Sequence, residues 1–156
     1  MNKGPRMTRS AAREIAVHLI YAVQCTGESV ETVLCDRFEE TYYALLSAEN
    51  EVYAEKPNGK QREYISSVVR GVCDRQQELD GYLAKYSVAW NVSRISRLAR
   101  AVMELAMYEA LYVEDVPMNV AINEAVKLTQ KYEEQETVAF VNGILGSFSR
   151  ERKTEA

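Results

Sequence analysis

The chain has 156 residues, which is enough for one average domain with a hydrophobic core of its own. Hydrophobic residues make up 47% and charged residues 27%, and the seven Gly and three Pro disfavour sandwiches, barrels and disordered linkers and favour helices. The net charge of −4 excludes a polycation, and the single histidine excludes a multi-histidine metal site and argues against a Ser-His-Asp triad.

A basic segment opens the chain. It contains four bases and no acid, namely Lys3, Arg6, Arg9 and Arg13. The three arginines are spaced by three and four residues, so on a helix or at its entrance they share one face. Arginine forks match phosphate geometry, and a helix N-terminus favours anions. The segment therefore predicts an anion-binding face, with a solvated basic tail as the alternative.

The first predicted helix follows this segment. Thr8 or Ser10 can cap it, and it runs to about Cys25, before Gly27 ends it. Its apolar residues recur at i, i+3, i+4 and i+7, which indicates one buried face. A secretory signal peptide is the alternative, but three polar residues interrupt the apolar run: Glu14, His18 and Gln24. Since no run of about 18 apolar residues occurs either, we expect a cytoplasmic protein.

An acidic stretch follows. Residues 28–55 contain eight acids and one base. A second helix is predicted from a Ser29 cap, with an apolar stripe from Val30 to Leu46. Residues 50–61 are predicted to form a loop around the turn Pro57-Asn58-Gly59, and a third helix covers about 61–79. A short segment over 81–86 and a break near 87–91 come next.

The second half contains three further predicted helices. Ser93 can cap a helix to about Tyr112 whose second half is apolar nearly all round, as in the buried centre of a bundle. A basic row lies at its start, formed by Arg94, Arg97 and Arg100, and a solvated face is its simpler interpretation. The last two helices cover about 118–132 and 135–150. We therefore predict an all-α fold of six to seven helices in a single domain over 1–156, with flexible ends at 1–8 and 151–156.

No group of residues indicates catalysis. The cysteines are not closely paired, and we expect all three to be core residues: Cys25, Cys35 and Cys73. His18 lies one position off the apolar stripe and is predicted to be a boundary residue. Glycine-rich phosphate loops are absent. The sequence therefore predicts no enzyme, no cofactor and no metal site.

Three segments carry a family resemblance: RSAAREIAVHLIYAVQ near the N-terminus, then VPMNVAINEAVKL and FVNGIL. Within them, Ala121 and Ala125 permit a close helix approach, and Asn142-Gly143 inside an apolar helix predicts a tight crossing. Over most of its length the chain resembles the NusB family of bacterial transcription antitermination factors. The resemblance implies two small helical bundles. It also implies binding of single-stranded boxA RNA jointly with NusE, a small-subunit ribosomal protein, and assembly with elongating RNA polymerase, notably on ribosomal RNA operons.

The resemblance also implies site residues. The resemblance assigns RNA binding to the basic N-terminal segment and to a later stretch. The residues are Lys3, Arg6, Arg9, Arg13, Glu136 and Phe140. NusE is expected to meet Tyr21 and the start of the central helix, at Ala99 and Arg100. Ala99 stands where some members have an acid, which removes a polar part of that contact. Phe140 lies one position off the stripe of its helix, so we expect a partly exposed ring.

Two other functions remain open. One is a helical interaction module that docks a protein through Tyr21, Tyr108 and Tyr112 and does not touch RNA. The other is a NusB-like domain related to those of ribosomal RNA methyltransferases, which would need a long catalytic domain after Ala156. The sequence is compatible with both a monomer and a homodimer.

Overall fold

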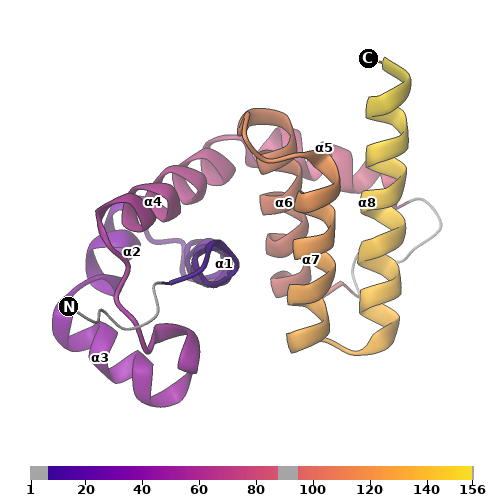
Figure 1. Ribbon diagram of the computed structural model, residues 1–156. Coiled ribbons are helices and arrows are strands. Elements are labelled where there is room, and N and C mark those ends of the chain that lie inside the picture. The colour runs from indigo at the N-terminus through magenta and orange to yellow at the C-terminus, as the bar shows by residue number, and fades with distance from the viewer. Residues whose placement is uncertain (1–6, 88–94, 156) are drawn as a thin grey trace. The chain divides into compact units, whose positions relative to one another are not determined.

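The structure, a computed structural model, describes residues 7–87 and 95–155, with side chains as far as Arg152. Over these ranges the chain forms eight α-helices and one 3-10 turn, and no strand (Figure 1). It divides into two compact units, residues 1–73 and 74–156. The predicted all-α fold is confirmed. The described residues form eight α-helices, where six to seven were expected.

The first unit holds four α-helices and the 3-10 turn: α1 (Arg9–Thr26), α2 (Val30–Arg37), α3 (Glu40–Glu49), η1 (Glu51–Tyr53) and α4 (Gly59–Asp74). The ends of α1 are as predicted. The Thr8 hydroxyl oxygen accepts a hydrogen bond from the Ala11 N–H at 3.0 Å. Gly27 has φ of 74°, a left-handed backbone that favours glycine, and its N–H donates to the Val23 carbonyl.

The single helix predicted after Ser29 is two helices. Ser29 caps α2 as expected, but α2 ends at Arg37, and α3 begins two residues after Phe38. The Glu39 carboxylate accepts from two backbone N–H groups of the next turn, those of Thr41 and Tyr42. These bonds lower the pKa of Glu39 and give α3 its own N-cap, which a continuous apolar stripe does not reveal.

The third predicted helix is also divided. Arg75, with φ of −108° and ψ of 20°, separates α4 from α5 (Gln76–Tyr86). The predicted segment over 81–86 therefore belongs to α5. The predicted loop over 50–61 contains η1, and α4 starts inside it at Gly59.

Aromatic contacts organise the core of the first unit. Ring centroids are 6.4 Å apart for Phe38 and Tyr43, 5.4 Å for Tyr43 and Tyr53, and 5.6 Å for Tyr53 and His18. Nδ1 of His18 lies 2.6 Å from the Tyr53 hydroxyl oxygen, so the half-buried imidazole is hydrogen-bonded. His18 is thus a boundary residue, as predicted. The chain of rings joins α1 to η1, α3 and the end of α2.

The second unit adds α5, α6 (Arg97–Tyr112), α7 (Met118–Tyr132) and α8 (Gln135–Glu155). Helices α6, α7 and α8 run alternately up, down and up, and α5 packs against α6 and α8 (Figure 1). The short loops over 113–117 and 133–134 explain the antiparallel order. Helix α6 is buried along most of its length, as its apolar second half predicted. Phe148 of α8 is fully buried, with the rings of Tyr82 and Tyr86 edge-on to it.

Several local predictions were wrong. Ser96, not Ser93, caps α6, and Ser93 lies outside the described residues. Of the three cysteines expected in the core, Cys25 and Cys35 are exposed and Cys73 is half-buried, because the first two fall on the solvent sides of short or ending helices.

The small residues near the C-terminus also differ in role. Ala121 and Ala125 are buried, and α7 packs against both α6 and α8, as close approach requires. Asn142 and Gly143 are exposed, so they do not form the predicted crossing. Helix α8 continues to Glu155, five residues beyond its predicted end. None of the described helices is long and apolar enough to cross a bilayer.

Candidate nucleic-acid interface

Arg9 begins α1 and is exposed. Its guanidinium carbon lies 3.9 Å from the centroid of the Tyr64 ring of α4. This stacking restricts the arginine side chain but leaves its N–H donors at the edge of the guanidinium plane. Arg9 therefore presents a prearranged fork of the kind that binds phosphate.

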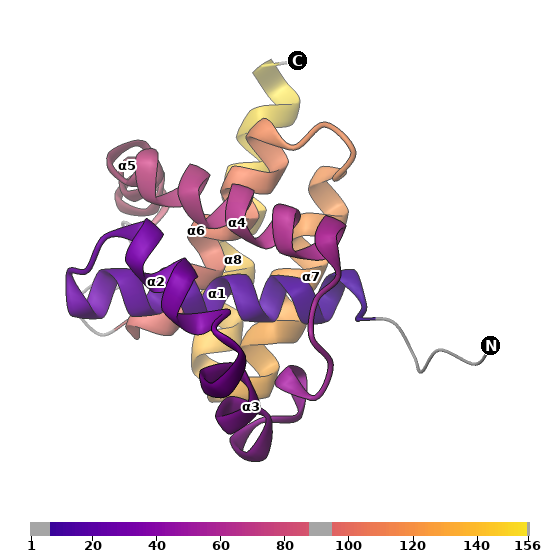
Figure 2. The same cartoon turned by 90° about the vertical axis from the view of Figure 1, so that its left-hand side faces the viewer.

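The first turn of α4 is held against the entrance to α1. Asn58 and Gln61 form a reciprocal capping box, in which each backbone N–H donates to the other's side-chain oxygen at 2.9 Å. The Gln61 amide nitrogen also donates to the Met7 carbonyl oxygen at 2.5 Å. The N-terminal ends of α1 and α4 consequently lie side by side, and Figure 2 shows both ends at the same side of the first unit.

Neither of these two helices has an acid in its first turn. The first turns of α2, α3, α5 and α8 each contain a glutamate, which suits the positive end of a helix dipole. In α4 the early residues include exposed Lys60 and Arg62 instead. Sequence reasoning missed Lys60, because it placed residues up to 61 in a loop and did not bring them beside α1. The Arg62 guanidinium lies 4.8 Å from the centroid of the Phe38 ring and is not part of this interface.

Arg13 differs from Arg9. Its side chain is only 7% exposed, although the arginine spacing predicted a shared solvent face. Helix periodicity aligns side chains along a helix but does not say which aligned positions other elements cover. Lys3, Arg6 and Arg94 lie outside the described residues.

The second unit contains the later RNA-binding candidates. Glu136 is exposed in the first turn of α8, whereas Phe140, one turn further on, is 5% exposed and not the partly exposed ring expected. The Phe140 ring lies on the apolar face of α8, together with the buried side chains of Val141 and Ile144.

The partner candidates are placed unequally. Tyr21 of α1 is 40% exposed. Ala99 is fully buried, and its N–H donates to the Ser96 cap. Arg100 is half-buried, with its guanidinium 3.7 Å from an Asp80 carboxylate oxygen. Of the two α6 positions, Arg100 is the one that solvent reaches.

Two of the three tyrosines of the protein-only alternative lie in a polar cluster on the second unit, and the third, Tyr21, lies on α1. Tyr108 and Tyr112 have ring centroids 5.4 Å apart, and Tyr112 is exposed. The Tyr112 hydroxyl donates to both Glu78 carboxylate oxygens, at 2.6 and 2.8 Å. This bond to a carboxylate raises the pKa of Tyr112. The Tyr112 hydroxyl is therefore already hydrogen-bonded within the protein.

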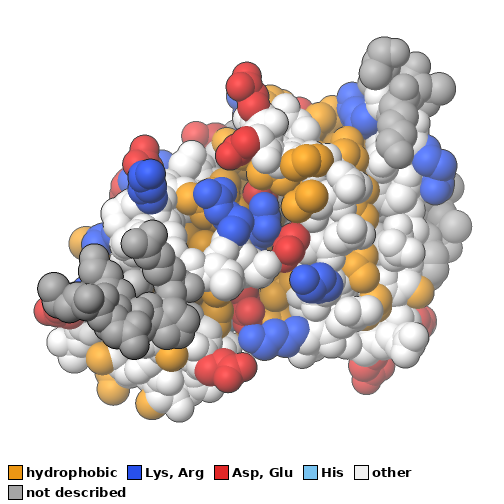
Figure 3. All heavy atoms as spheres, viewed as in Figure 1, with side chains coloured by type: hydrophobic (Ala, Val, Ile, Leu, Met, Phe, Trp, Pro, Cys, Tyr) orange, Lys and Arg blue, Asp and Glu red, His pale blue; other side chains and the backbone are white. Residues whose placement is uncertain are grey.

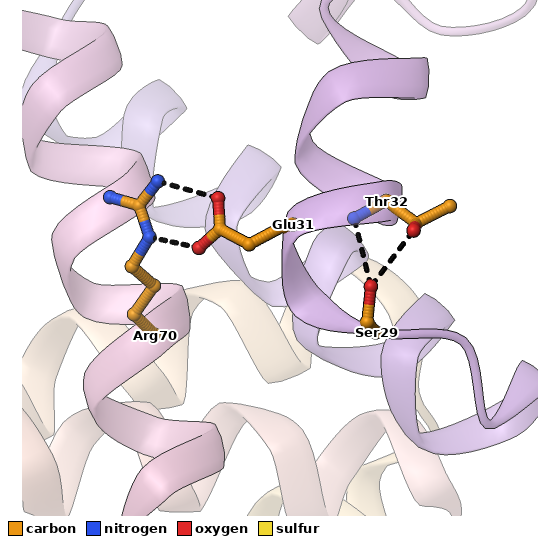
Figure 4. Close-up of polar contacts among 4 residues, drawn as sticks. All are labelled: Ser29, Glu31, Thr32 and Arg70. Carbon is orange, nitrogen blue, oxygen red and sulfur yellow. Dashed lines mark hydrogen bonds and ion pairs between the residues drawn. The ribbon is translucent and has the colours of Figure 1, made fainter.

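Positive charge is exposed locally in spite of the negative net charge. Figure 3 shows exposed Lys and Arg side chains, and also exposed acidic ones, among apolar and uncharged atoms. Some bases are instead paired with acids: the Arg70 guanidinium makes two hydrogen bonds to Glu31, at 2.6 and 3.0 Å (Figure 4). The pair lowers the pKa of Glu31 and raises that of Arg70. Lys85 is likewise paired with Glu151.

The described residues contain no group of three or more His, Cys, Asp or Glu side chains arranged to hold a metal ion. The arrangement at the ends of α1 and α4 instead offers fixed positive charge beside aromatic surface. Such a surface can bind a phosphate backbone without any covalent step.

Comparisons with known proteins identify relatives over most of the chain. The model of the NusB family matches residues 10–150. The transcription antitermination protein NusB of Acetivibrio thermocellus is 41% identical over 140 residues, which cover 90% of this chain and 87% of that protein. The solved structure of T. maritima NusB is 25% identical, with a TM-score of 0.75, and the match covers 97% of this chain and all of that one.

A further solved structure resembles the chain in fold. It is a crystal structure of the antitermination factors NusB and NusE in complex with dsRNA. The matched chain is 20% identical, with a TM-score of 0.68, and the match covers 89% of this chain and 93% of that one.

Proposed function

Because this chain belongs to the NusB family, we propose that it acts in transcription antitermination by binding single-stranded boxA RNA together with NusE. The observation that carries the proposal is the match of nearly the whole chain to proteins named for this activity. The expected setting is processive transcription of ribosomal RNA operons in the cytoplasm. The protein acts there as a binding factor and not as an enzyme.

The mechanism uses binding energy alone. Arg9, fixed over Tyr64, neutralises a phosphate, and contacts to unpaired bases add sequence preference. NusE adds surface, so RNA and NusE each tighten the binding of the other through one coupling free energy. Elongating RNA polymerase is reached indirectly, through the assembled complex.

The residues proposed for RNA contact are those of the sequence prediction: Lys3, Arg6, Arg9, Arg13, Glu136 and Phe140. Exposure supports Arg9 and Glu136 most directly. For NusE, the exposed ring of Tyr21 is the strongest candidate, followed by Arg100 and Ala99. We propose that both compact units serve one RNA-binding domain, because the family match extends through both.

The test is fluorescence anisotropy of a labelled boxA RNA titrated with the full chain, with and without purified NusE. We expect binding that tightens about 5- to 150-fold with NusE, the usual range of coupling between two ligands. A scrambled RNA of the same length is the control for sequence preference. Absence of RNA binding under both conditions would contradict the proposal and favour the protein-only module.

A further inference from the structure

We propose that Lys60 of α4 and Arg9 of α1 together form one phosphate-binding site for the RNA backbone. The site is built around the Tyr64 ring, on the first unit alone. This inference rests on the proposed function and adds α4 to the RNA-contacting surface. No part of the sequence resemblance involves Lys60.

The position of Tyr64 brings the two bases together. Lys60 lies four residues before Tyr64 on α4, and residues at this spacing are neighbours on a helix surface. The Arg9 guanidinium lies 3.9 Å from the centroid of the same ring. Lys60 and Arg9 therefore flank one aromatic side chain from two different helices.

Among the described residues, no acid forms an ion pair with either base. Both bases are exposed. Arg70, Lys85 and Arg100 each face a carboxylate instead. Placing bases in a first helical turn also opposes the helix dipole. A bound anion would offset the unfavourable interaction of these bases with the helix dipole. It would also offset the repulsion between the two bases.

The chemistry of the pair suits phosphate. Arg9 supplies a planar fork whose orientation is already restricted by stacking, and Lys60 supplies a mobile point charge. Because the fork is held in place before binding, less side-chain freedom is lost when a phosphate arrives. The half-buried Tyr64 ring lies beneath the Arg9 guanidinium.

Arg62 provides a matched control on the same helix. It is exposed like Lys60 and only two residues away, but a two-residue step turns about 200° around a helix. Its guanidinium accordingly lies elsewhere, 4.8 Å from the centroid of the Phe38 ring. Lys60→Glu and Arg62→Glu change the net charge equally. They differ in the side of α4 on which the charge changes.

The experiment measures boxA RNA binding by the full chain and by these two variants over a range of salt concentrations. We expect Lys60→Glu to weaken binding about tenfold and to reduce the magnitude of the log–log salt slope by about 0.7, the value for one single-strand phosphate contact. Arg62→Glu should stay within about twofold of the parent chain. Lys60→Gln should act in the same direction by a smaller amount. Thermal unfolding monitored by circular dichroism checks that each variant is folded.

Four outcomes overturn the inference. If the parent chain binds RNA and Lys60→Glu binds as tightly, Lys60 is outside the site and the proposed function stands. If both glutamate variants weaken binding equally, only overall charge matters. If the parent chain binds polyglutamate as tightly as RNA and Lys60→Glu weakens both, the surface is a general polyanion site. Absence of RNA binding by the parent chain removes the inference and the proposed function together.

Discussion

Aromatic rings lie beneath three exposed arginines of this protein. Arg9 lies over Tyr64, Arg62 over Phe38, and Arg75 over Tyr112, at 3.9, 4.8 and 4.0 Å from the ring centroids. A stacked guanidinium keeps its in-plane donors available while its side chain loses freedom. At the scale of single residues, stacking thus converts a flexible base into a directed one.

Arg9 is the residue whose loss should affect RNA binding most clearly. We expect Arg9→Glu to weaken binding of boxA RNA about tenfold, equivalent to about 1.4 kcal/mol. The RNA affinity of Arg9→Lys should lie between those of the parent chain and Arg9→Glu, because the lysine keeps the charge but lacks the planar fork. Anisotropy titrations measure both, with Lys127→Glu on α7 as an exposed control of equal charge change. An unchanged affinity for Arg9→Glu would exclude the α1 entrance from RNA contact.

Tyr43 predicts a loss of stability in alkali. Burial, followed by the nearby Glu55 carboxylate, raises the pKa of Tyr43 from its ordinary value of 10 to about 12. Folding therefore favours the neutral phenol, and this contribution is complete below pH 10 and is lost as the pH rises through about 12. Its hydroxyl also donates to the Glu55 carbonyl oxygen at 2.6 Å.

Urea unfolding of the parent chain and Tyr43→Phe checks this. At pH 8 the variant should be less stable by about 1 kcal/mol, the usual value of one hydrogen bond. The difference should narrow above pH 10, because only the parent chain ionises Tyr43 on unfolding. A difference that stays constant to pH 11 would show that Tyr43 titrates normally.

At the scale of elements, caps set helix boundaries that apolar spacing leaves undefined. Glu39 starts α3 where the stripe suggested continuation, and Ser29 starts α2 by accepting the Thr32 N–H at 3.1 Å. Helix α2 has only eight residues, too few for a helix to persist without tertiary contacts. Its cap and its pairing with α4 through Glu31 and Arg70 are therefore important to its formation.

Removing the α2 cap should destabilise the fold measurably. We expect Ser29→Ala to lower the free energy of unfolding by about 1 kcal/mol, because an N-terminal N–H loses its acceptor. Ser67→Ala, at an exposed position inside α4, is the control and should change stability by less than about 0.5 kcal/mol. Thermal or urea unfolding measures both. Equal effects of the two substitutions would argue against a capping role for Ser29.

At the scale of the whole molecule, an acidic chain carries a local basic surface. The net charge is −4, yet the first turns of α1 and α4 contain no acid. Local potential, and not net charge, determines where a polyanion binds. The negative net charge weakly repels an approaching anion, whereas the local bases attract it. Salt screens both effects.

RNA affinity should nevertheless fall as salt rises, because counterion release is local to the contacts. With about four phosphates contacted, the slope of log affinity against log salt should be about −3. Titrations at several salt concentrations measure it, with a neutral-backbone analogue of the same RNA sequence as the control. A slope near zero would indicate binding without phosphate contacts.

The sequence by itself determined the fold class, most helices and the family. Apolar periodicity and the residues Thr8 and Gly27 defined α1 to within a residue, because caps and left-handed stops are local chemistry. The motifs VAINEA and FVNGIL identified the family without revealing their packing. The basic segment pointed to phosphate binding from its composition and the spacing of its arginines.

Only the tertiary structure decided which side chains meet. Arg13 is buried and Arg9 is exposed although both share the predicted face, because coverage depends on elements distant in the chain. Lys60 lies 51 positions from Arg9 in the sequence, and the two come to the same end of the first unit because the start of α4 lies beside the entrance of α1. Contacts between residues so far apart arise from packing of whole helices, which local periodicity does not encode.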